Sequence, residues 1–283
     1  MTTATLHADV VLPRHGWRAL LWVVPLTAVW IGLTYSFPMV SASGVQTVAV
    51  RVFIHMMLAL GLWLGLERTD LTPGQRRNFW LAVLIPYTLW LAVIWSGAIS
   101  GVFRPGASPV PLLPLAIFLP VIVGAPILLG SKWMGQVLDA MPATCLIALQ
   151  LYRVFGSVFL VGWARNVVPA VFALPAGIGD VITGLLAVPI AISLAADTPE
   201  ARRAAIGWNV FGLVDFAVAV SIGLMIAPGP FQLIVPSIPN ATLGVYPNVM
   251  IPVFAVPSSI LLHALSLRQL RRRHTALSHH PSH

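Results

Sequence analysis

Charged residues are scarce in this sequence, and their scarcity decides the class of protein. Only 8% of the 283 residues are charged, whereas 58% are hydrophobic. A soluble globular domain has about 25% charged residues. Because a water-soluble fold of this length cannot hide so much apolar surface, lipid must be the solvent. The composition therefore predicts a polytopic integral membrane protein.

Cysteine and lysine are each present once, which excludes several kinds of site. Cys145 lies in an apolar run, so the chain has no intrachain disulfide. Without CxxC or CxxCH, it has neither a thiolate metal site nor covalently attached haem. The single lysine, Lys132, lies in a predicted loop, which excludes a retinal Schiff base inside the bundle. No P-loop is present, which excludes ATP hydrolysis by this chain.

Long apolar runs fill most of the chain. A bilayer core needs about 20 apolar residues per helix. The hydropathy pattern predicts one all-α transmembrane domain over residues 1–267, followed by a basic, His-rich cytoplasmic tail at 268–283. Prolines in the fourth and sixth runs predict kinks or partial unwinding there. The eight predicted spans are 18–37, 46–66, 78–99, 111–130, 143–163, 172–195, 205–227 and 248–267.

The first span has an alternative interpretation as a signal peptide. Arg14 and Arg18 precede the apolar run, and Ser41-Ala42-Ser43 follows it. The run is longer than the 7–15 apolar residues typical of signal peptides, which favours a retained helix. Cleavage would leave seven spans.

Arginine and lysine are distributed unevenly between the two sides of the predicted bundle. With the N-terminus inside, 12 of the 16 basic residues lie in inside segments and 2 in outside segments, while Arg51 and Arg153 lie within spans. This bias predicts cytoplasmic N- and C-termini in a bacterial-type inner membrane. The net charge of +8 is therefore a signal of topology and of contact with lipid headgroups, and does not indicate nucleic-acid binding.

Ionisable residues inside the spans are the main evidence for a functional site. Each costs several kcal/mol unless it is paired or hydrated. Judged by depth, Arg51 should pair with Asp180 and Arg153 with Asp215, and the alternative is Arg153 with Asp180. With one neighbouring amide, the candidates for binding a substrate or an ion are Arg51, His55, Gln150, Arg153, Asp180, Asp215 and His263.

These candidates leave several functions open. The leading hypothesis is that an interior polar site binds or transports a small solute. One alternative is a membrane enzyme acting on a lipid or another hydrophobic substrate, and another is a set of purely structural charge pairs. No cofactor or metal is predicted, although haem b or a metal at His55 and His263 is a further alternative.

Two segments outside the spans also carry alternatives. The basic, His-rich tail favours lipid-headgroup anchoring and disorder, and the alternative is capture of a metal by His274, His279, His280 and His283. The apolar loop at 228–247 either lies in the membrane interface or covers a cavity. The expected partners are membrane lipids and a small solute or ion, and the oligomeric state is left open.

Overall fold

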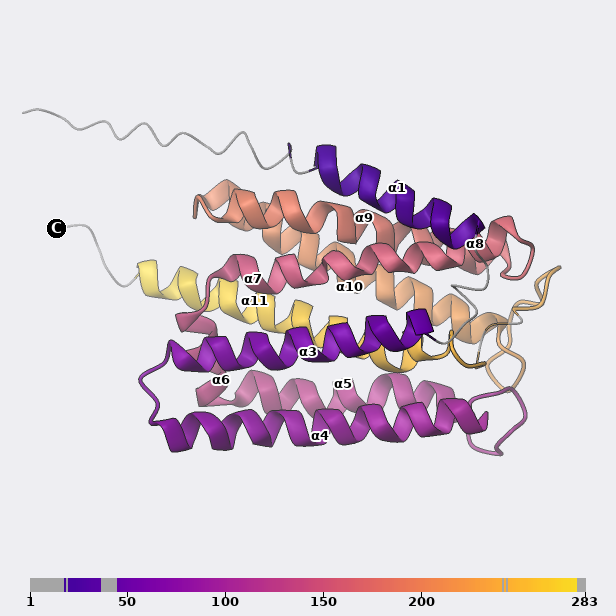
Figure 1. The fold of residues 1–283 in the computed structure, drawn as a ribbon, viewed down its shortest axis with the longest axis horizontal. Coiled ribbons are helices and arrows are strands. Elements are labelled where there is room, and N and C mark those ends of the chain that lie inside the picture. Colours follow the sequence, from indigo (N-terminus) through magenta and orange to yellow (C-terminus); the bar gives the residue numbers. More distant parts are fainter. Residues whose placement is uncertain (1–17, 19, 37–44, 241, 243, 279–283) are drawn as a thin grey trace, which may run out of the picture.

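The regular structure is helical throughout the part of the chain described by the computed structural model, which covers residues 18, 20–36, 45–240, 242 and 244–278 (Figure 1). The signal-peptide motif at 41–43 and the histidines at 279, 280 and 283 lie outside it. The elements are α1 Leu20–Ser36, α3 Val45–Glu67, α4 Pro73–Ser100, α5 Leu112–Gly130, α6 Lys132–Ala140, α7 Ala143–Ala148, η2 Leu149–Ser157, α8 Val158–Ala164, α9 Ala170–Leu194, α10 Pro199–Ile226, η3 Ile251–Ala255 and α11 Val256–Ser278.

Seven helical segments are long and apolar enough to cross a membrane. They begin with α3, and the α7–η2–α8 and η3–α11 runs each count as one. The fold class predicted from composition is confirmed to this extent: the described part of the chain is all-helical, and its seven membrane-length apolar helices fit a multi-pass membrane protein. The first predicted span corresponds to α1, which is apolar but shorter than the other seven.

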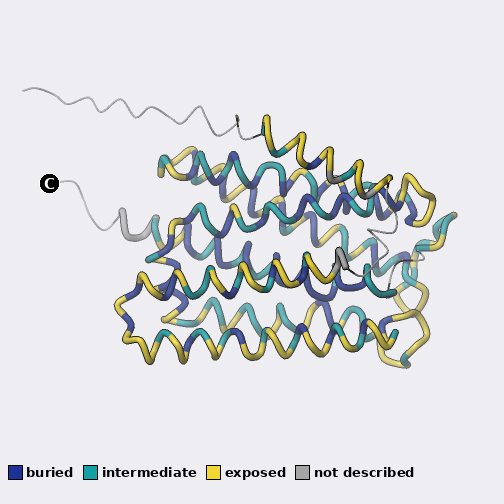
Figure 2. The backbone as a smooth tube through the Cα atoms, viewed as in Figure 1, coloured by how far each residue is buried: buried dark blue, intermediate teal, exposed yellow. Residues whose placement is uncertain are grey.

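The long helices lie side by side along one direction (Figure 1). The final helix α11 packs against α5, α7 and α10, so it occupies the middle of the bundle. Burial follows this arrangement: 61% of the span at 251–273 is buried, against 11% of α5 (Figure 2). The last four spans, from α7–η2–α8 to η3–α11, are thus the more buried ones, whereas α3, α4 and α5 are the more exposed.

The first helix, α1, lies against α8 and α9 at the edge of the bundle (Figure 1). Its outward side chains are large and apolar: Leu21, Trp22 and Leu26 are about 70% exposed. Such exposure is unfavourable in water but ordinary for a helix whose solvent is hydrocarbon.

Two helix starts show why the long helices begin where they do. Thr72 caps α4 with its hydroxyl, and Gln75 returns a side-chain contact to the Thr72 backbone, which completes a capping box. Thr198 caps α10 with its hydroxyl, which accepts from the Ala201 backbone, and Pro199 follows at the first helical position. Both connections are short, so neighbouring spans run in opposite directions.

The helical geometry is irregular at two places, and neither is a place that the sequence predicted. The nine residues of η2 form a 3₁₀ helix, and the five of η3 form a π-helix. By contrast, α5 continues through Pro120 and Pro126, and α9 through Pro175 and Pro189. A 3₁₀ run of this length is uncommon, and such stretches often mark functional positions.

The last helix extends further than predicted. The span was expected to end at residue 267, but α11 continues to Ser278. Gln269 is fully buried and donates to the carbonyl oxygens of Leu138 and Met141. The beginning of the predicted tail is therefore packed against α6.

Candidate functional site

The guanidinium group of Arg153, in η2, lies at the centre of the candidate site. Its Nε donates to Asp180 Oδ1 of α9 at 2.8 Å, and its Nη2 donates to Asp215 Oδ2 of α10. Its Nη1 donates to the Gly212 carbonyl oxygen at 3.3 Å. The Phe216 ring lies 3.8 Å from Cζ, and Arg153 is only 3% exposed. Every nitrogen of this buried cation therefore has a partner.

The predicted charge pairs are partly confirmed. Arg153 pairs with Asp215, as predicted, and also with Asp180, the alternative partner. The predicted pair of Arg51 with Asp180 is wrong, because the Asp180 carboxylate faces η2. The prediction assigned the charges to two depths with one pair at each, whereas Arg153 contacts both aspartates, so depth alone did not decide which partners meet.

A neutral histidine extends the network on the α11 side. Arg153 Nη1 lies 3.1 Å from His263 Nε2, and Asn209 Oδ1 lies 2.9 Å from His263 Nδ1. Because an arginine can only donate, Nε2 is the acceptor and Nδ1 carries the proton. The Asn209 amide then donates to the Ala205 carbonyl oxygen and to Ser266 Oγ. These side chains join η2, α10 and α11 in one buried set of hydrogen bonds.

Glycines allow the three helices to approach the network closely. A Cβ atom at Gly179 would overlap the Asp215 carboxylate, and one at Gly212 would overlap the His263 ring. Small residues at helix contacts have this role in membrane bundles, where the backbones must come together. The glycines that precede Asp180 and Asp215 along α9 and α10 are therefore required by packing around the ion pairs.

The second arginine of the site, Arg51 of α3, differs from Arg153 in its lack of a charged partner among the described residues. It is 5% exposed and has no ion-pair partner among the described residues. Its Nε is buried without a hydrogen-bond partner. An unpaired buried cation is costly in a bilayer. Within the described residues, Arg51 is therefore a buried cation without a compensating charge.

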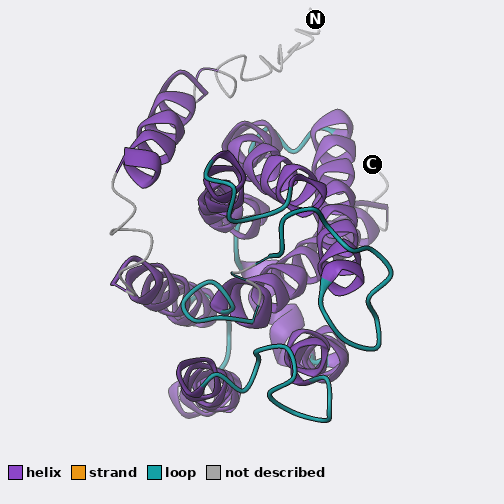
Figure 3. Ribbon diagram, turned by 90° about the vertical axis from the view of Figure 1, so that its right-hand side faces the viewer, coloured by secondary structure: helices purple, strands orange, loops and turns teal. Residues whose placement is uncertain are grey.

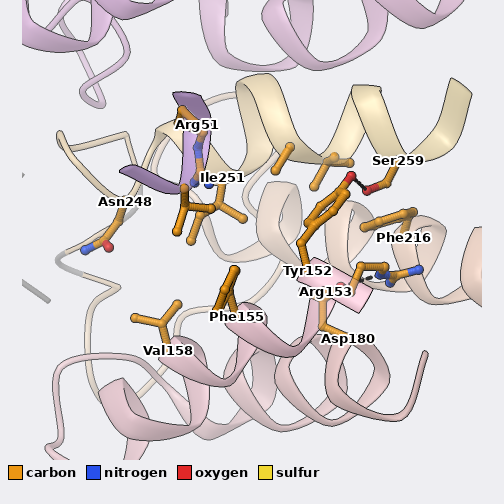
Figure 4. A pocket seen from close by; sticks show the side chains of 14 residues that line it. Arg51, Tyr152, Arg153, Phe155, Val158, Asp180, Phe216, Asn248, Ile251 and Ser259 are labelled. Atoms are coloured by element: carbon orange, nitrogen blue, oxygen red, sulfur yellow. Dashed lines mark hydrogen bonds and ion pairs between the residues drawn. The ribbon is translucent and has the colours of Figure 1, made fainter. Parts of the chain in front are cut away.

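A small cavity separates Arg51 from the Arg153 network (Figure 4). It has a volume of about 60 Å³. Arg51 and Asn248 border it on one side, and Arg153 with Asp180 on the other. The remaining wall residues are Val50, Tyr152, Phe155, Gly156, Val158, Phe216, Ile251, Ala255, Val256 and Ser259.

A second cavity of about 60 Å³ adjoins the first and shares Asp180, Phe216 and Asn248 with it. Asp215 also borders this second cavity. The loop after α10 contributes Asn240, Thr242 and Gly244 to its wall. Of the two interpretations of the 228–247 loop, this position favours a cover over a cavity. The loops seen end-on in Figure 3 lie at this end of the bundle.

Hydroxyl and amide groups between η2 and α11 complete the site. The Tyr152 hydroxyl is hydrogen-bonded to Ser259 Oγ, and Gln150 Nε2 donates to the Ser259 carbonyl oxygen at 3.0 Å. Gln150 was a predicted candidate, whereas Tyr152 was not. Tyr152 lies in an apolar stretch of the sequence and carries no pattern that marks a site. It directly precedes Arg153 in the 3₁₀ helix η2, and there it borders the cavity.

The two histidines proposed for haem or a metal have separate environments. His55 stacks on Tyr87, with ring centroids 5.2 Å apart, and its Nε2 lies 3.2 Å from the Thr88 hydroxyl. Both ring nitrogens of His263 already have partners in the Arg153 network. Within the described residues, no three His, Cys, Asp or Glu side chains lie close enough to hold a metal ion. The geometry thus gives no support to an axial pair at His55 and His263.

Comparison with known sequences places the chain in a family. A family pattern matches residues 110–271, which is more than half of the chain. The chain belongs to the family described as a domain of unknown function, DUF8737. The DUF8737 region runs from the loop before α5 into α11, so it includes Arg153, Asp180, Asp215 and His263 but not Arg51. No curated protein and no solved structure matches the chain.

Proposed function

We propose that this protein binds a small solute carrying an anionic group in the cavity between Arg51 and the Arg153–Asp180 pair. The observation that carries the proposal is the buried guanidinium group of Arg51 at a cavity wall, whose Nε lacks a hydrogen-bond partner and which has no ion-pair partner in the described part of the chain. An anion placed there would supply the compensating charge that Arg51 lacks.

A purely structural role explains the Arg153 network but leaves Arg51 unexplained. Arg153 has two carboxylate partners and fixes η2, α9 and α10 relative to one another. Arg51 holds no second helix through an ion pair in the described part of the chain. A buried charge without a partner is more costly than none at all, so a ligand is the simplest compensation.

The size of the cavity limits the solute. A water molecule needs about 10–15 Å³ of such volume, so about 60 Å³ holds about four to six water-sized groups. A small carboxylate or an inorganic anion fits this space, whereas a lipid headgroup with its glycerol does not. Residues of the 228–247 loop line the adjoining cavity, so we expect the solute to enter from that end of the bundle.

Thermal unfolding of the purified protein tests the proposal. Sodium acetate, glycine and sodium phosphate would each be compared with sodium chloride at equal ionic strength. A ligand present at 100 times its Kd stabilises the folded state by about 2.7 kcal/mol. We expect at least one probe to raise the Tm of the wild-type protein and to have no effect on Arg51→Gln.

A matched control uses an arginine at the same end of the bundle but outside the cavities. Arg165 follows α8 and contacts the Tyr35 backbone and ring. Arg165→Gln should retain the full response to the active probe. If Arg51→Gln responds as strongly as the wild type, or if no probe stabilises the wild type, binding at Arg51 is refuted.

Transport through the bundle is the extension of this proposal. The two cavities lie toward the end that carries the 228–247 loop, so movement to the other face requires a change in the packing of α9, α10 and α11. Uptake of the active anion into proteoliposomes, compared with Arg51→Gln, separates a transporter from a binding protein.

We also propose that both termini face the cytoplasm and that the membrane is a bacterial-type inner membrane. The uneven distribution of basic residues supports this orientation. Single cysteines placed in the loop at 228–247 and at the C-terminus of a Cys145→Ala background test it. A membrane-impermeant maleimide should label the first from outside intact cells and leave the second unlabelled.

A further inference from the structure

A large apolar cavity, which shares no lining residue with the candidate site, lies further along the bundle. Its volume is about 460 Å³, and residues of α3, α4, α5, α6 and α11 form most of its wall. Protein interiors rarely leave voids larger than a water molecule, and ligand pockets occupy about 300–1,000 Å³. A space of this size is therefore large enough to hold a ligand.

The wall of this cavity selects a hydrocarbon ligand. Nearly all of its side chains are aliphatic or aromatic. The hydroxyl groups of Tyr87 and Ser258 lie at the wall, but they are hydrogen-bonded to each other at 2.9 Å, and Ser258 also donates to the Phe254 carbonyl oxygen. The indole nitrogen of Trp90 is buried and has no hydrogen-bond partner among the described residues, so it is one unsatisfied donor in an otherwise apolar wall. The wall thus offers little that would hold a polar solute.

One end of the cavity lies at α6, where cationic and aromatic side chains gather. Leu128 and Met134 border the cavity on either side of the α5–α6 junction. Lys132, between them in the sequence, is exposed and has no ion-pair partner among the described residues. The neighbouring Trp133 is 38% exposed, and Arg268 donates to the Leu128 carbonyl oxygen at 3.0 Å. Tryptophan and basic residues in such positions mark the level of the lipid headgroups.

We infer that this cavity holds an acyl chain of an anionic phospholipid whose headgroup lies beside Lys132. The hydrocarbon of the surrounding bilayer is the solvent of α4 and α5, so the ligand needs no aqueous route. The free cation at the α6 end supplies charge complementarity for a phosphate. This site is separate from the Arg51 cavity, and its occupancy does not depend on the proposed function.

A cavity-filling variant at Gly61 of α3 tests the inference. Gly61 borders the cavity, and a Cβ atom added there meets no atom within 4 Å, so Gly61→Phe should fill part of the space. Gly207 of α10 is also open to its surroundings but borders none of the three cavities, which makes Gly207→Phe the matched control.

The readout is native mass spectrometry of protein purified in mild detergent. We expect a single phospholipid adduct on the wild type and on Gly207→Phe, and loss of that adduct from Gly61→Phe. Absence of lipid from the wild type, or an equal adduct on Gly61→Phe, would overturn the inference. If Gly61→Phe does not fold, Gly61→Leu is measured in the same way, with the wild-type result decisive in either case.

Delipidated protein tests the headgroup. Phosphatidylglycerol should raise the Tm of the wild type more than phosphatidylcholine with the same acyl chains. Lys132→Gln should respond equally to both lipids. An equal rise in the Tm of the wild type with both lipids would refute the contact with Lys132. No rise in its Tm with either lipid would refute the site itself. Acetate binding at Arg51 should be unchanged in each variant.

Discussion

Replacing Arg153 by methionine is the strongest perturbation of the buried network. Methionine keeps much of the volume of the side chain but removes the charge and all five donors. The two carboxylates that share Arg153, from Asp180 and Asp215, are then left in the bundle without a cation. Removing one partner of a buried ion pair costs about 3–5 kcal/mol, because the remaining charge is uncompensated. We expect Arg153→Met to lose at least this much.

The network contains one arginine and two aspartates, so the cost of a substitution depends on which of these residues is replaced. One arginine serves two aspartates, so Asp215→Asn leaves a balanced pair of Arg153 with Asp180. Its cost should be about 1–2 kcal/mol, close to that of a single weakened hydrogen bond. In the double variant Arg153→Met/Asp215→Asn, one of the two orphaned carboxylates is already neutral. The double variant should therefore be more stable than the sum of the single losses predicts, by about 0.5–3 kcal/mol.

Unfolding in mixed detergent micelles at increasing SDS fraction measures these free energies. Arg203→Met is the control, because Arg203 and Glu200 form an exposed pair, with side chains 73% and 69% exposed. Exposed pairs contribute about 0–1 kcal/mol. An Arg153→Met loss no larger than that of the control, or strictly additive losses in the double variant, would refute the account of the network.

Two further predictions concern the packing of this network. Gly179→Ala places a methyl group against the Asp215 carboxylate and should destabilise the protein by about 1–3 kcal/mol. The control Gly207→Ala lies in open space and should be neutral or slightly stabilising. An equal effect of the two substitutions in SDS unfolding would contradict the close approach of α9 and α10. His263→Phe leaves the Arg153 Nη1 donor without its imidazole partner, so we expect a loss of about 1–3 kcal/mol. The same unfolding assay checks it, and an unchanged stability would show that the hydrogen bond contributes nothing.

The membrane spans could be predicted from the sequence because hydropathy alone decides them. Each of the seven long apolar helices overlaps a predicted span, and the differences lie at the ends. The last helix continues well beyond its predicted end at residue 267, and this difference has a physical reason. Residues 268–278 are polar and basic, so their hydropathy indicates a tail, but Gln269 and Leu270 pack against neighbouring helices and continue the helix.

The ion pairs could be predicted only in part. The sequence gives the depth of Arg153, Asp180 and Asp215, which was enough to predict that buried charges pair. It does not give the order of helices around the bundle or the 3₁₀ geometry of η2, and these set which carboxylate reaches which guanidinium. The error at Arg51 has this origin, since α3 borders the cavity on the side away from Asp180.

The cavities themselves could not be predicted from the sequence. Asn248 and Tyr152 border the polar cavity from a loop and from an irregular helix, and neither residue belongs to a pattern that marks a site. The apolar cavity is lined by ordinary aliphatic residues, whose sequence is the same whether they pack against protein or surround a lipid chain. Only the three-dimensional arrangement separates these cases.

The central claim is that the cavity between Arg51 and Asp180 binds a small anion. Crystals soaked in sodium bromide test it most directly, because the anomalous signal identifies the bound ion as bromide. We predict a bromide peak inside the cavity, beside the Arg51 guanidinium, and no such peak in Arg51→Gln. An empty cavity in the wild type, or an unchanged peak in Arg51→Gln, would contradict the claim.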